Sequence, residues 1–536
     1  MAETETPSRA ETAAAAWTPK FNPWLIAVVV ALAAFMEVLD TSIANVALPH
    51  IAGNLGASND ESTWVLTSYL AANAIVLPIS GWLAGRFGRK RFFTSCIVLF
   101  TASSLLCGAA PTLGILIVFR ALQGVGGGGL QPMAQAILAD TFPPEKRGLA
   151  FALYGITAVI APTVGPTLGG WITDNYSWRW IFYINLPVGA LAVFLVLRML
   201  EDPPYLTLQR AARASLDYAG VALLAVGVAA LQILLDKGQE EDWFGSRFIA
   251  ALAATAAVCL VSLVIWELRH KAPILEVRLF KNFNFAASNL MMFILGVLYF
   301  ASLVMMPQLL QTLMGYTATL AGLVLSGSGL VLLFEMPLVG QLTSRYPAKY
   351  IMSFGWLCMA AAMYFSAIRI DLLMSFGYAS RLRIFQAFAL GFLFVPITLS
   401  AYVGLPGEKS NAIAGMINFM RNMGSSVGTS LVTTLLARRA QFHQTVLGAH
   451  ANLYNPAFRN QLSAAAAQMA RSGASAADAQ RKAYAALYRE LEAQAQTLAY
   501  IDTFKVLAMG AGIMFALTFL LRKNDPRGGG ARAMAE

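Results

Sequence analysis

Long apolar runs recur along the chain, separated by short stretches rich in charged residues, glycine or proline. A membrane-spanning helix needs about 20 predominantly apolar residues. Runs of this kind predict fourteen spans and an all-α membrane protein. The predicted spans are residues 24–47, 63–83, 92–110, 113–138, 149–172, 179–199, 217–236, 248–267, 284–309, 318–342, 349–368, 376–402, 411–436 and 499–521.

Lysine and arginine are distributed unevenly between the two sides of these spans. With the N-terminus placed inside, the tails and short even-numbered loops hold 22 of them, and the short odd-numbered loops hold 6. Positive residues concentrate in cytoplasmic loops, whereas long translocated loops such as 437–498 escape this bias. The asymmetry predicts that both termini are cytoplasmic. Residues 1–20 lack the regions of a cleaved signal peptide, and we interpret them and residues 523–536 as flexible cytoplasmic tails.

The composition indicates that lipid, rather than water, surrounds this chain. Of its 536 residues 57% are hydrophobic and 12% are charged, whereas a soluble domain has about a quarter charged residues. The net charge of +10 follows the topology just described and gives no reason to expect nucleic acid as a partner. The four cysteines lie in apolar segments, and the chain has no CxxC pair or histidine cluster. We therefore predict no disulfide framework, no metal site and no cofactor.

The first and second halves of the chain share a repeat. At offsets of 259 and then 263, one set of residues recurs in order, with Pro78, Gly81, Leu83, Arg86, Lys90, Arg120 and Gln123 matching Pro337, Gly340, Leu342, Arg345, Lys349, Arg383 and Gln386. Each half then holds six spans of the same orientation, and two further spans lie between the halves. This predicts a six-helix bundle over 21–200, two inserted linker helices over 201–282, and a second bundle over 283–522.

Four short motifs carry a resemblance to a known family. In chain order they are Asp40-Thr41 continuing to Asn45 and Pro49, Gly81 to Lys90 with Arg86, Gly88 and Arg89, Arg120-Ala-Leu-Gln123-Gly124, and Gly165-Pro166-Thr-Leu-Gly169-Gly170. The first resembles the first-helix motif of the fourteen-span drug:proton antiporters. The others resemble the signature loop, the fourth-helix motif and the antiporter motif of the major facilitator superfamily. The resemblance covers essentially the whole chain and implies two pseudo-symmetric bundles around a cavity that opens to alternate sides.

One position departs from the family pattern. The signature loop usually has an acid where this chain has Gly85, which removes one partner of a cytoplasmic charge brace. We therefore do not carry that brace over to this chain. The antiporter motif, from Gly165 to Gly170, supplies small side chains and a proline bend, which would let one half rock against the other.

Charged residues inside the predicted spans are candidates for proton coupling, because ionisable groups at membrane depth are costly. Glu37 and Asp40 lie three residues apart, and therefore on one face of the first helix. Two close carboxylates resist ionising together, which suits a group that loads and releases a proton. Arg120 in span 4 is the expected counter-charge. The alternative is that these charges only brace the helices, or that Glu37 attracts cationic substrates.

The second half has its own candidate residues for the substrate pocket. Glu335 and Arg421 are interpreted as its isolated intramembrane charges, and Asn418 lies one turn before Arg421. Arg421 either packs within a helix face of small residues or neutralises an acidic substrate. Asn45 and Gln123 complete the pocket candidates from the first half.

The loop at 437–498 is too polar to span a membrane and is predicted to be external. Ser475 and Asp478 have the spacing of a helix cap. An apolar stripe follows at helical spacing, formed by Tyr484, Leu487, Tyr488 and Leu491. An exposed stripe of this kind marks a contact, so the segment either folds back on the transporter or docks a partner. In the tripartite systems of related pumps, that partner is a periplasmic membrane-fusion adaptor leading to an outer-membrane channel.

The resemblance implies a protein that exports small amphipathic compounds in exchange for protons across the bacterial inner membrane. A dedicated exporter of one metabolite, fatty acid or siderophore is the alternative within the same fold. A transport-dead receptor is a remote alternative, because Glu37, Asp40 and Arg120 are retained. The chain has no nucleophile–base arrangement or nucleotide-binding motif, so we do not expect an enzyme.

Overall fold

The computed structural model describes residues 19–202, 217–270, 273–406, 409–473 and 475–519. The predicted tails at 1–20 and 523–536 lie almost entirely outside the described residues. The helices are α2 (Pro23–Leu55), α3 (Asn59–Ser62), α4 (Trp64–Phe87), α5 (Arg89–Ala109), α6 (Leu113–Gly127), α7 (Leu130–Thr141), α8 (Pro144–Asn175), α9 (Trp180–Tyr183), α10 (Asn185–Met199), α12 (Tyr218–Lys237), η1 (Trp243–Gly245), α13 (Arg247–Arg269), η2 (Val277–Lys281), α14 (Phe283–Leu295), η3 (Gly296–Phe300), α15 (Ala301–Thr312), α16 (Ala318–Arg345), α17 (Ala348–Arg369), α18 (Phe376–Ser400), α19 (Ser410–His450), α20 (Pro456–Arg471) and α21 (Ala476–Thr518).

Within the described ranges, thirteen helical segments are long and apolar enough to cross a membrane. The remaining predicted span, 411–436, lies within α19, which is less apolar because it carries Arg421 and several glycine, serine and asparagine residues. α19 packs against α4, α14, η3 and α21, so it has little need of a lipid-facing apolar surface. The prediction of an all-α membrane protein is confirmed, and the helices are consistent with fourteen spans.

Two predicted spans are interrupted along their length. The span at 113–138 divides into α6 and α7 at a glycine pair, and the span at 284–309 contains the π-helical turn η3 between α14 and α15. Just before this pair, α6 approaches α5 closely. A Cβ on Gly126 would lie 2.6 Å from the backbone nitrogen of Phe100. Small residues permit this close approach of two helices in a membrane.

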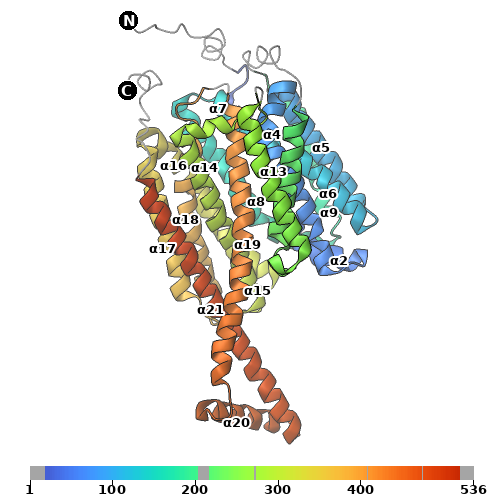
Figure 1. Ribbon diagram of the computed structural model, residues 1–536, viewed down its shortest axis with the longest axis vertical. Helices are drawn as coiled ribbons and strands as arrows, with labels where there is room; N and C mark the ends of the chain where they lie inside the picture. Colours follow the sequence, from blue (N-terminus) through green and yellow to red (C-terminus); the bar gives the residue numbers. More distant parts are fainter. Residues whose placement is uncertain (1–18, 203–216, 271–272, 407–408, 474, 520–536) are drawn as a thin grey trace.

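Two helical bundles lie side by side (Figure 1). α8 packs against α2 of the first bundle and against α16 of the second, and α19 of the second bundle packs against α4 and α7 of the first. The contact between the bundles therefore has two sides, one at α8 and α16 and the other at α4 and α19. The inserted helices α12 and α13 pack against each other, and α12 also packs against both α4 and α19.

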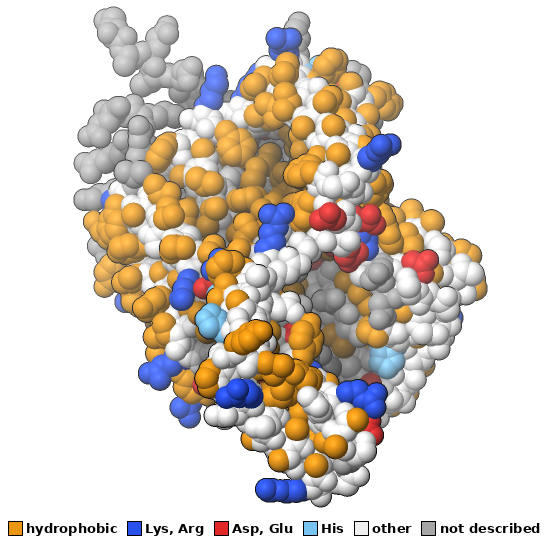
Figure 2. Space-filling model, turned by 60° about the horizontal axis from the view of Figure 1, so that its bottom comes forward, with side chains coloured by type: hydrophobic (Ala, Val, Ile, Leu, Met, Phe, Trp, Pro, Cys, Tyr) orange, Lys and Arg blue, Asp and Glu red, His pale blue; other side chains and the backbone are white. Residues whose placement is uncertain are grey.

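Large apolar side chains point outward from many of these helices. Val258 on α13 is 65% exposed, and Phe334 on α16 is 76% exposed. Figure 2 shows hydrophobic side chains over much of the flank of the molecule. Lipid, rather than water, suits so large an exposed apolar surface, and the chain is a multi-pass membrane protein.

The polar segment at 437–498, called the antenna below, projects from one end of the bundles (Figure 1). α19 and α21 each run from a bundle into the antenna, where α20 packs against α21. The predicted cap of α21 is confirmed, because the Ser475 hydroxyl accepts a hydrogen bond from the Asp478 backbone N–H at 3.3 Å. Gln444 of α19 donates to the Tyr488 hydroxyl at 3.0 Å. The antenna thus covers part of its own apolar stripe and does not fold back on the bundles.

Candidate functional site

A buried ion pair inside the first bundle joins α2 to α6. Arg120 Nη1 donates to Asp40 Oδ2 at 2.6 Å, and neither side chain is more than 1% exposed. Arg120 Nε also donates to the carbonyl of Val65 at 3.1 Å, and the guanidinium lies 4.3 Å from the centre of the Tyr69 ring. Burying two charges is costly unless their remaining hydrogen-bonding groups are satisfied. The two residues that the sequence predicts as partners are therefore in direct contact.

Two amide side chains add hydrogen bonds to this pair, although Arg120 Nη2 has no partner among the described residues. Gln123 accepts from Arg120 at 2.8 Å and donates to Asp40 Oδ1 at 3.0 Å. Asn185 of α10 donates to the same carboxylate oxygen at 2.7 Å. Sequence reasoning missed Asn185, although an amide inside the predicted span at 179–199 was a usable signal. Gln123, predicted to line the pocket, lies in this ion-pair cluster instead.

Glu37 belongs to a second polar cluster, one turn earlier on α2. Its carboxylate accepts hydrogen bonds from Gln131 at 2.5 Å, from the Tyr69 hydroxyl at 2.9 Å and from Asn73 at 3.1 Å. Tyr69 connects the two clusters, because its hydroxyl bonds Glu37 while its ring lies against Arg120. A change of charge at either acid therefore acts on a side chain that also contacts the other cluster.

Gln131 of α7 extends the Glu37 cluster to the second bundle. Its Oε1 accepts hydrogen bonds from the Tyr154 hydroxyl at 3.1 Å and from Arg421 Nη2 on α19. Asn418, one turn before Arg421, donates to Gln135 of α7 at 2.8 Å. Both predicted residues of α19 thus contact the first bundle, and Gln131 alone separates the Glu37 carboxylate from the Arg421 guanidinium.

A cavity of about 470 Å³ lies between the bundles. Glu37, Asn45 and Arg421 line it, as predicted for a pocket, and its α19 wall runs from Arg421 to Thr433, toward the antenna end. The inserted helix α12 forms part of the wall. Five of the predicted coupling and pocket residues lie away from this lining, namely Asp40, Arg120, Gln123, Glu335 and Asn418.

At the end opposite the antenna, the two bundles are held together by polar contacts. Arg89 of the signature loop pairs with Asp140 of α7 at 2.7 Å, and both side chains are less than 10% exposed. Ser410, the first residue of α19, contacts Arg89 at 3.4 Å and donates to Asp140 at 3.2 Å. Gly81 lets α4 and α19 touch here, since a Cβ on it would lie 2.8 Å from the backbone nitrogen of Ala412. These contacts join the bundles without an acid at position 85.

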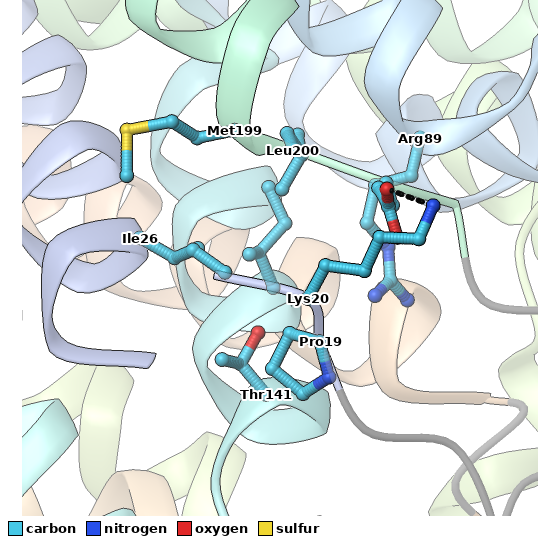
Figure 3. A pocket seen from close by; sticks show the side chains of 9 residues that line it. Pro19, Lys20, Ile26, Arg89, Thr141, Met199 and Leu200 are labelled. Carbon is cyan, nitrogen blue, oxygen red and sulfur yellow. Dashed lines mark hydrogen bonds and ion pairs between the residues drawn. The ribbon is translucent and has the colours of Figure 1, made fainter. Parts of the chain in front are cut away.

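The other signature-loop residues have separate surroundings. Gly88 has a φ of 92°, a conformation that glycine adopts readily and other residues avoid. The Arg86 guanidinium lies 5.8 Å from the centre of the Trp82 ring. Arg89 also lines a small cavity of about 10 Å³ beside Lys20, which pairs with Glu201 at 2.8 Å (Figure 3).

The antiporter motif lies on α8, where that helix packs against α2. Added Cβ atoms on Gly165 and Gly169 would contact Ser42 and Ile43 of α2 respectively, the second at 3.0 Å. Pro166 lies inside α8, and a Cβ on Gly170 would meet no atom within 4 Å. Gly165 and Gly169, but not Gly170, therefore make the close approach possible.

Glu335 and Arg383 lie in the second bundle, away from this cavity. Glu335 of α16 is 4% exposed, and neither carboxylate oxygen has a hydrogen-bond partner among the described residues. Arg383, at the edge of a predicted span, is fully buried and donates to Ser302 at 3.1 Å and to Gln386 at 3.0 Å. The interpretation of Glu335 and Arg421 as the isolated charges of this half is therefore incomplete. Arg383 is a third buried charge of this half, and the internal repeat, which matches Arg383 with Arg120, was the signal that could have identified it.

Comparisons with known proteins agree with this architecture. A family model described as Major Facilitator Superfamily matches residues 30–429. The multidrug export protein EmrB of Haemophilus influenzae is 39% identical over 496 residues, which cover 92% of this chain and 95% of that protein. The fatty acid resistance protein FarB of Neisseria gonorrhoeae is 40% identical over 426 residues, covering 79% of this chain and 83% of that protein.

A solved structure supports the fold alone. The proton:xylose symporter XylE of the major facilitator superfamily, bound to 6-bromo-6-deoxy-D-glucose, superposes with a TM-score of 0.58 at 14% identity. The match covers 94% of this chain and 97% of that one.

Proposed function

The chain belongs to the major facilitator superfamily, and from this premise we propose that it is a proton-driven antiporter exporting amphipathic drugs or toxic hydrophobic compounds across the bacterial inner membrane. The observation that carries the proposal is the buried Asp40–Arg120 pair beside a cavity lined by Glu37. An ion pair at membrane depth lowers the stability of a membrane protein, and such pairs commonly mark proton pathways. The name of the EmrB relative supports export of several drugs.

The two acids have different roles in this proposal. Glu37 lines the cavity and is the acid that protons reach first. Protonation there weakens its hydrogen bond from Gln131, which also accepts from Arg421 of the second bundle. Protonation of Asp40 weakens its attraction to Arg120, which frees α2 and α6 to move relative to each other. A proton and a cationic or neutral substrate then compete for one conformational equilibrium, as antiport requires.

Alternating access has a natural starting point in this conformation. The end opposite the antenna is closed by Arg89, Asp140 and Ser410, while the cavity lining extends toward the antenna end. We propose that this is the outward-facing arrangement, with both termini cytoplasmic and the antenna periplasmic. Rocking of the bundles about the contact of α8 with α16, where Gly148 and Gly340 meet, then opens the opposite end.

We further propose that the antenna docks a periplasmic membrane-fusion adaptor leading to an outer-membrane channel, so that the chain is the pump of a tripartite system. Tyr484 and Tyr488 remain 39% and 56% exposed on α21. Aromatic side chains with a polar tip are favoured at protein interfaces. A projecting helical pair with such side chains suits a partner outside the membrane.

A second candidate function is export of one class of acidic amphiphile, such as a fatty acid. Arg421 lines the cavity and could neutralise a carboxylate, and the relative named for fatty acid resistance supports this alternative. Substrate competition separates the two candidates, because a fatty-acid exporter would transport carboxylates and would not transport cations.

The test is substrate-driven proton movement in proteoliposomes containing the wild-type chain, Asp40→Asn or Glu37→Gln. We expect a panel of amphipathic drugs to drive proton movement through the wild type. Asp40→Asn should abolish it, because an amide cannot carry the proton, and Glu37→Gln should lower it. Drug-dependent proton flux that survives both substitutions would contradict the assignment of these acids. A wild type that moves no protons with any drug would contradict antiport itself.

A further inference from the structure

The inserted helix α12 contributes to the cavity that the repeat assigns to the two bundles. It lies against α4 of the first bundle and α19 of the second, on one side of their contact. Gln232 and Asp236 near its C-terminal end line the cavity, as does Glu240 in the turn that follows the helix. The expectation of a linker helix does not account for this position.

Hydrogen bonds fix this part of α12 to both bundles. Gln232 Nε2 donates to Ser426 of α19 at 2.9 Å, and the Thr67 hydroxyl of α4 donates to Asp236. Farther on, Trp243 Nε1 donates to Thr434 of α19 at 3.1 Å. The cavity-lining residues of α12 are therefore held in place from two sides.

The charge along this wall is predominantly negative. Among the cavity-lining side chains Glu37, Asp236 and Glu240 are acidic and Arg421 is basic, which leaves a formal charge of −2 when all four are ionised. Lys237, which is buried and not part of the lining, pairs with Glu240 at 2.6 Å, and counting it the formal charge is −1. Figure 2 shows acidic side chains gathered beside a hollow on the face that carries the antenna. A cation entering or leaving the cavity from this end meets these carboxylates first.

Two buried polar atoms in the same lining point to a ligand. Gln232 is 3% exposed, and its Oε1 has no hydrogen-bond partner among the described residues. Ser430 of α19 is 5% exposed, and its hydroxyl likewise has none. Leaving such groups unsatisfied is costly, and an acceptor beside two carboxylates suits a ligand with N–H donors and positive charge.

We propose that the cavity-lining end of α12 is a binding subsite for organic cations bearing amino or amidino groups, formed by Gln232, Asp236 and Glu240 with Ser430 of α19. The inserted hairpin thereby determines which compounds the pump prefers. This inference rests on the proposed export function, since the subsite lies in the same cavity. In this subsite Asp236 supplies negative charge, the Gln232 Oε1 accepts a hydrogen bond from the ligand, and Glu240 lies at the mouth of the cavity.

The test uses ethidium, a cation with two amino groups, and N-phenyl-1-naphthylamine, a neutral amphiphile. Fluorescence titration measures the Kd of each probe for the full-length protein in nanodiscs. We expect Asp236→Asn to raise the Kd for ethidium about tenfold, which is the effect of about 1.4 kcal/mol, and to change the Kd for the neutral probe much less. The amide keeps an acceptor for Thr67, so the wall is preserved. Asp236→Glu should restore ethidium binding, and Glu240→Gln should give a smaller loss.

Glu241→Gln is the matched control, because Glu241 is an exposed acid next to Glu240 and does not line the cavity. It should bind ethidium as the wild type does. Equal ethidium binding by the wild type, Asp236→Asn and Glu240→Gln would overturn the proposal, as would a wild type that does not bind ethidium. Binding in nanodiscs needs no proton gradient, so a failure of proton coupling in proteoliposomes is recognised separately.

Discussion

The two bundles place an arginine and a glutamine at repeat-related positions but surround them differently. In the first, Arg120 and Gln123 hold the Asp40 carboxylate. In the second, Arg383 and Gln386 meet the hydroxyls of Ser302 and Ser366, and Arg383 has no ion pair among the described residues. Both guanidiniums lie against a tyrosine ring, 4.3 Å from Tyr69 and 4.9 Å from Tyr299.

This difference distinguishes the role of the arginine, glutamine and tyrosine that both bundles share from the role of the Asp40 carboxylate. An arginine on an aromatic ring, hydrogen-bonded to a glutamine three residues later, is common to both bundles. It can therefore serve packing without any titration. Among the described residues, only the first bundle adds a carboxylate to this arrangement, and we propose that this addition makes it the proton-coupled half.

The largest effect is expected from replacing each arginine by glutamine. Arg120→Gln leaves Asp40 buried without its cation, and breaking a buried pair in this way costs about 3–5 kcal/mol. Arg383→Gln leaves no carboxylate without its cation but removes a donor from Ser302 and Gln386, so we expect a smaller loss of about 1–3 kcal/mol. Thermal unfolding in lipid-containing detergent and proton flux in proteoliposomes measure the two variants. Equal losses of stability and of flux would mean that the carboxylate does not distinguish the halves.

An intermediate effect is expected from giving the second bundle the acid it lacks. Ser302 Oγ lies 3.1 Å from Arg383 Nη1, so Ser302→Asp brings a carboxylate within reach of the guanidinium. A double-mutant cycle with Arg383→Gln should give a favourable coupling of about 0.5–3 kcal/mol. We expect no rescue of proton flux in an Asp40→Asn background, because Ser302 does not line the cavity. Rescue there would show that any buried acid–arginine pair suffices.

The smallest effect is expected at the two glutamines. Gln123→Leu leaves Asp40 Oδ1 with one donor fewer, and Gln386→Leu removes an acceptor from Arg383 and a donor from Ser366. Losing partners of buried polar groups costs about 1–3 kcal/mol. We expect similar stability losses from both variants but slower proton-coupled export from Gln123→Leu alone. Identical transport rates for both would remove Gln123 from the coupling cluster.

Sequence patterns predicted the spans and the Asp40–Arg120 contact well, for a physical reason. Apolar length follows the thickness of the bilayer, and few partners exist for an arginine at membrane depth. Arg383 lies inside the predicted span 376–402 but close to its start, where a charged side chain is expected to reach the membrane surface; its burial against Tyr299 could not be read from hydropathy. The repeat relating it to Arg120 carried the better information.

The role of α12 could not be predicted from the same patterns. Hydropathy gives the length of a helix but not the neighbours it packs against, and the repeat excludes α12 because it has no counterpart in either half. Its cavity wall depends on contacts with Thr67 and Ser426, residues distant in sequence. The antenna was predicted as external, but the continuity of α19 and α21 into it was not, because polarity marks where lipid ends and not where a helix ends.

The continuity of α19 and α21 into the antenna has a mechanical consequence. α19 has 41 residues from Ser410, beside the closed end, to His450 in the antenna, which is about 60 Å of unbroken helix. Arg439 and His443 of α19 both contact Asp502 of α21, at 2.5 Å and 2.8 Å, so the two helices are fastened together where they leave the bundle. A tilt of about 5° at one end of such a rod displaces the other by about 5 Å. The helix acts as a lever, and whatever binds the antenna is connected by one rigid part to the far side of the membrane.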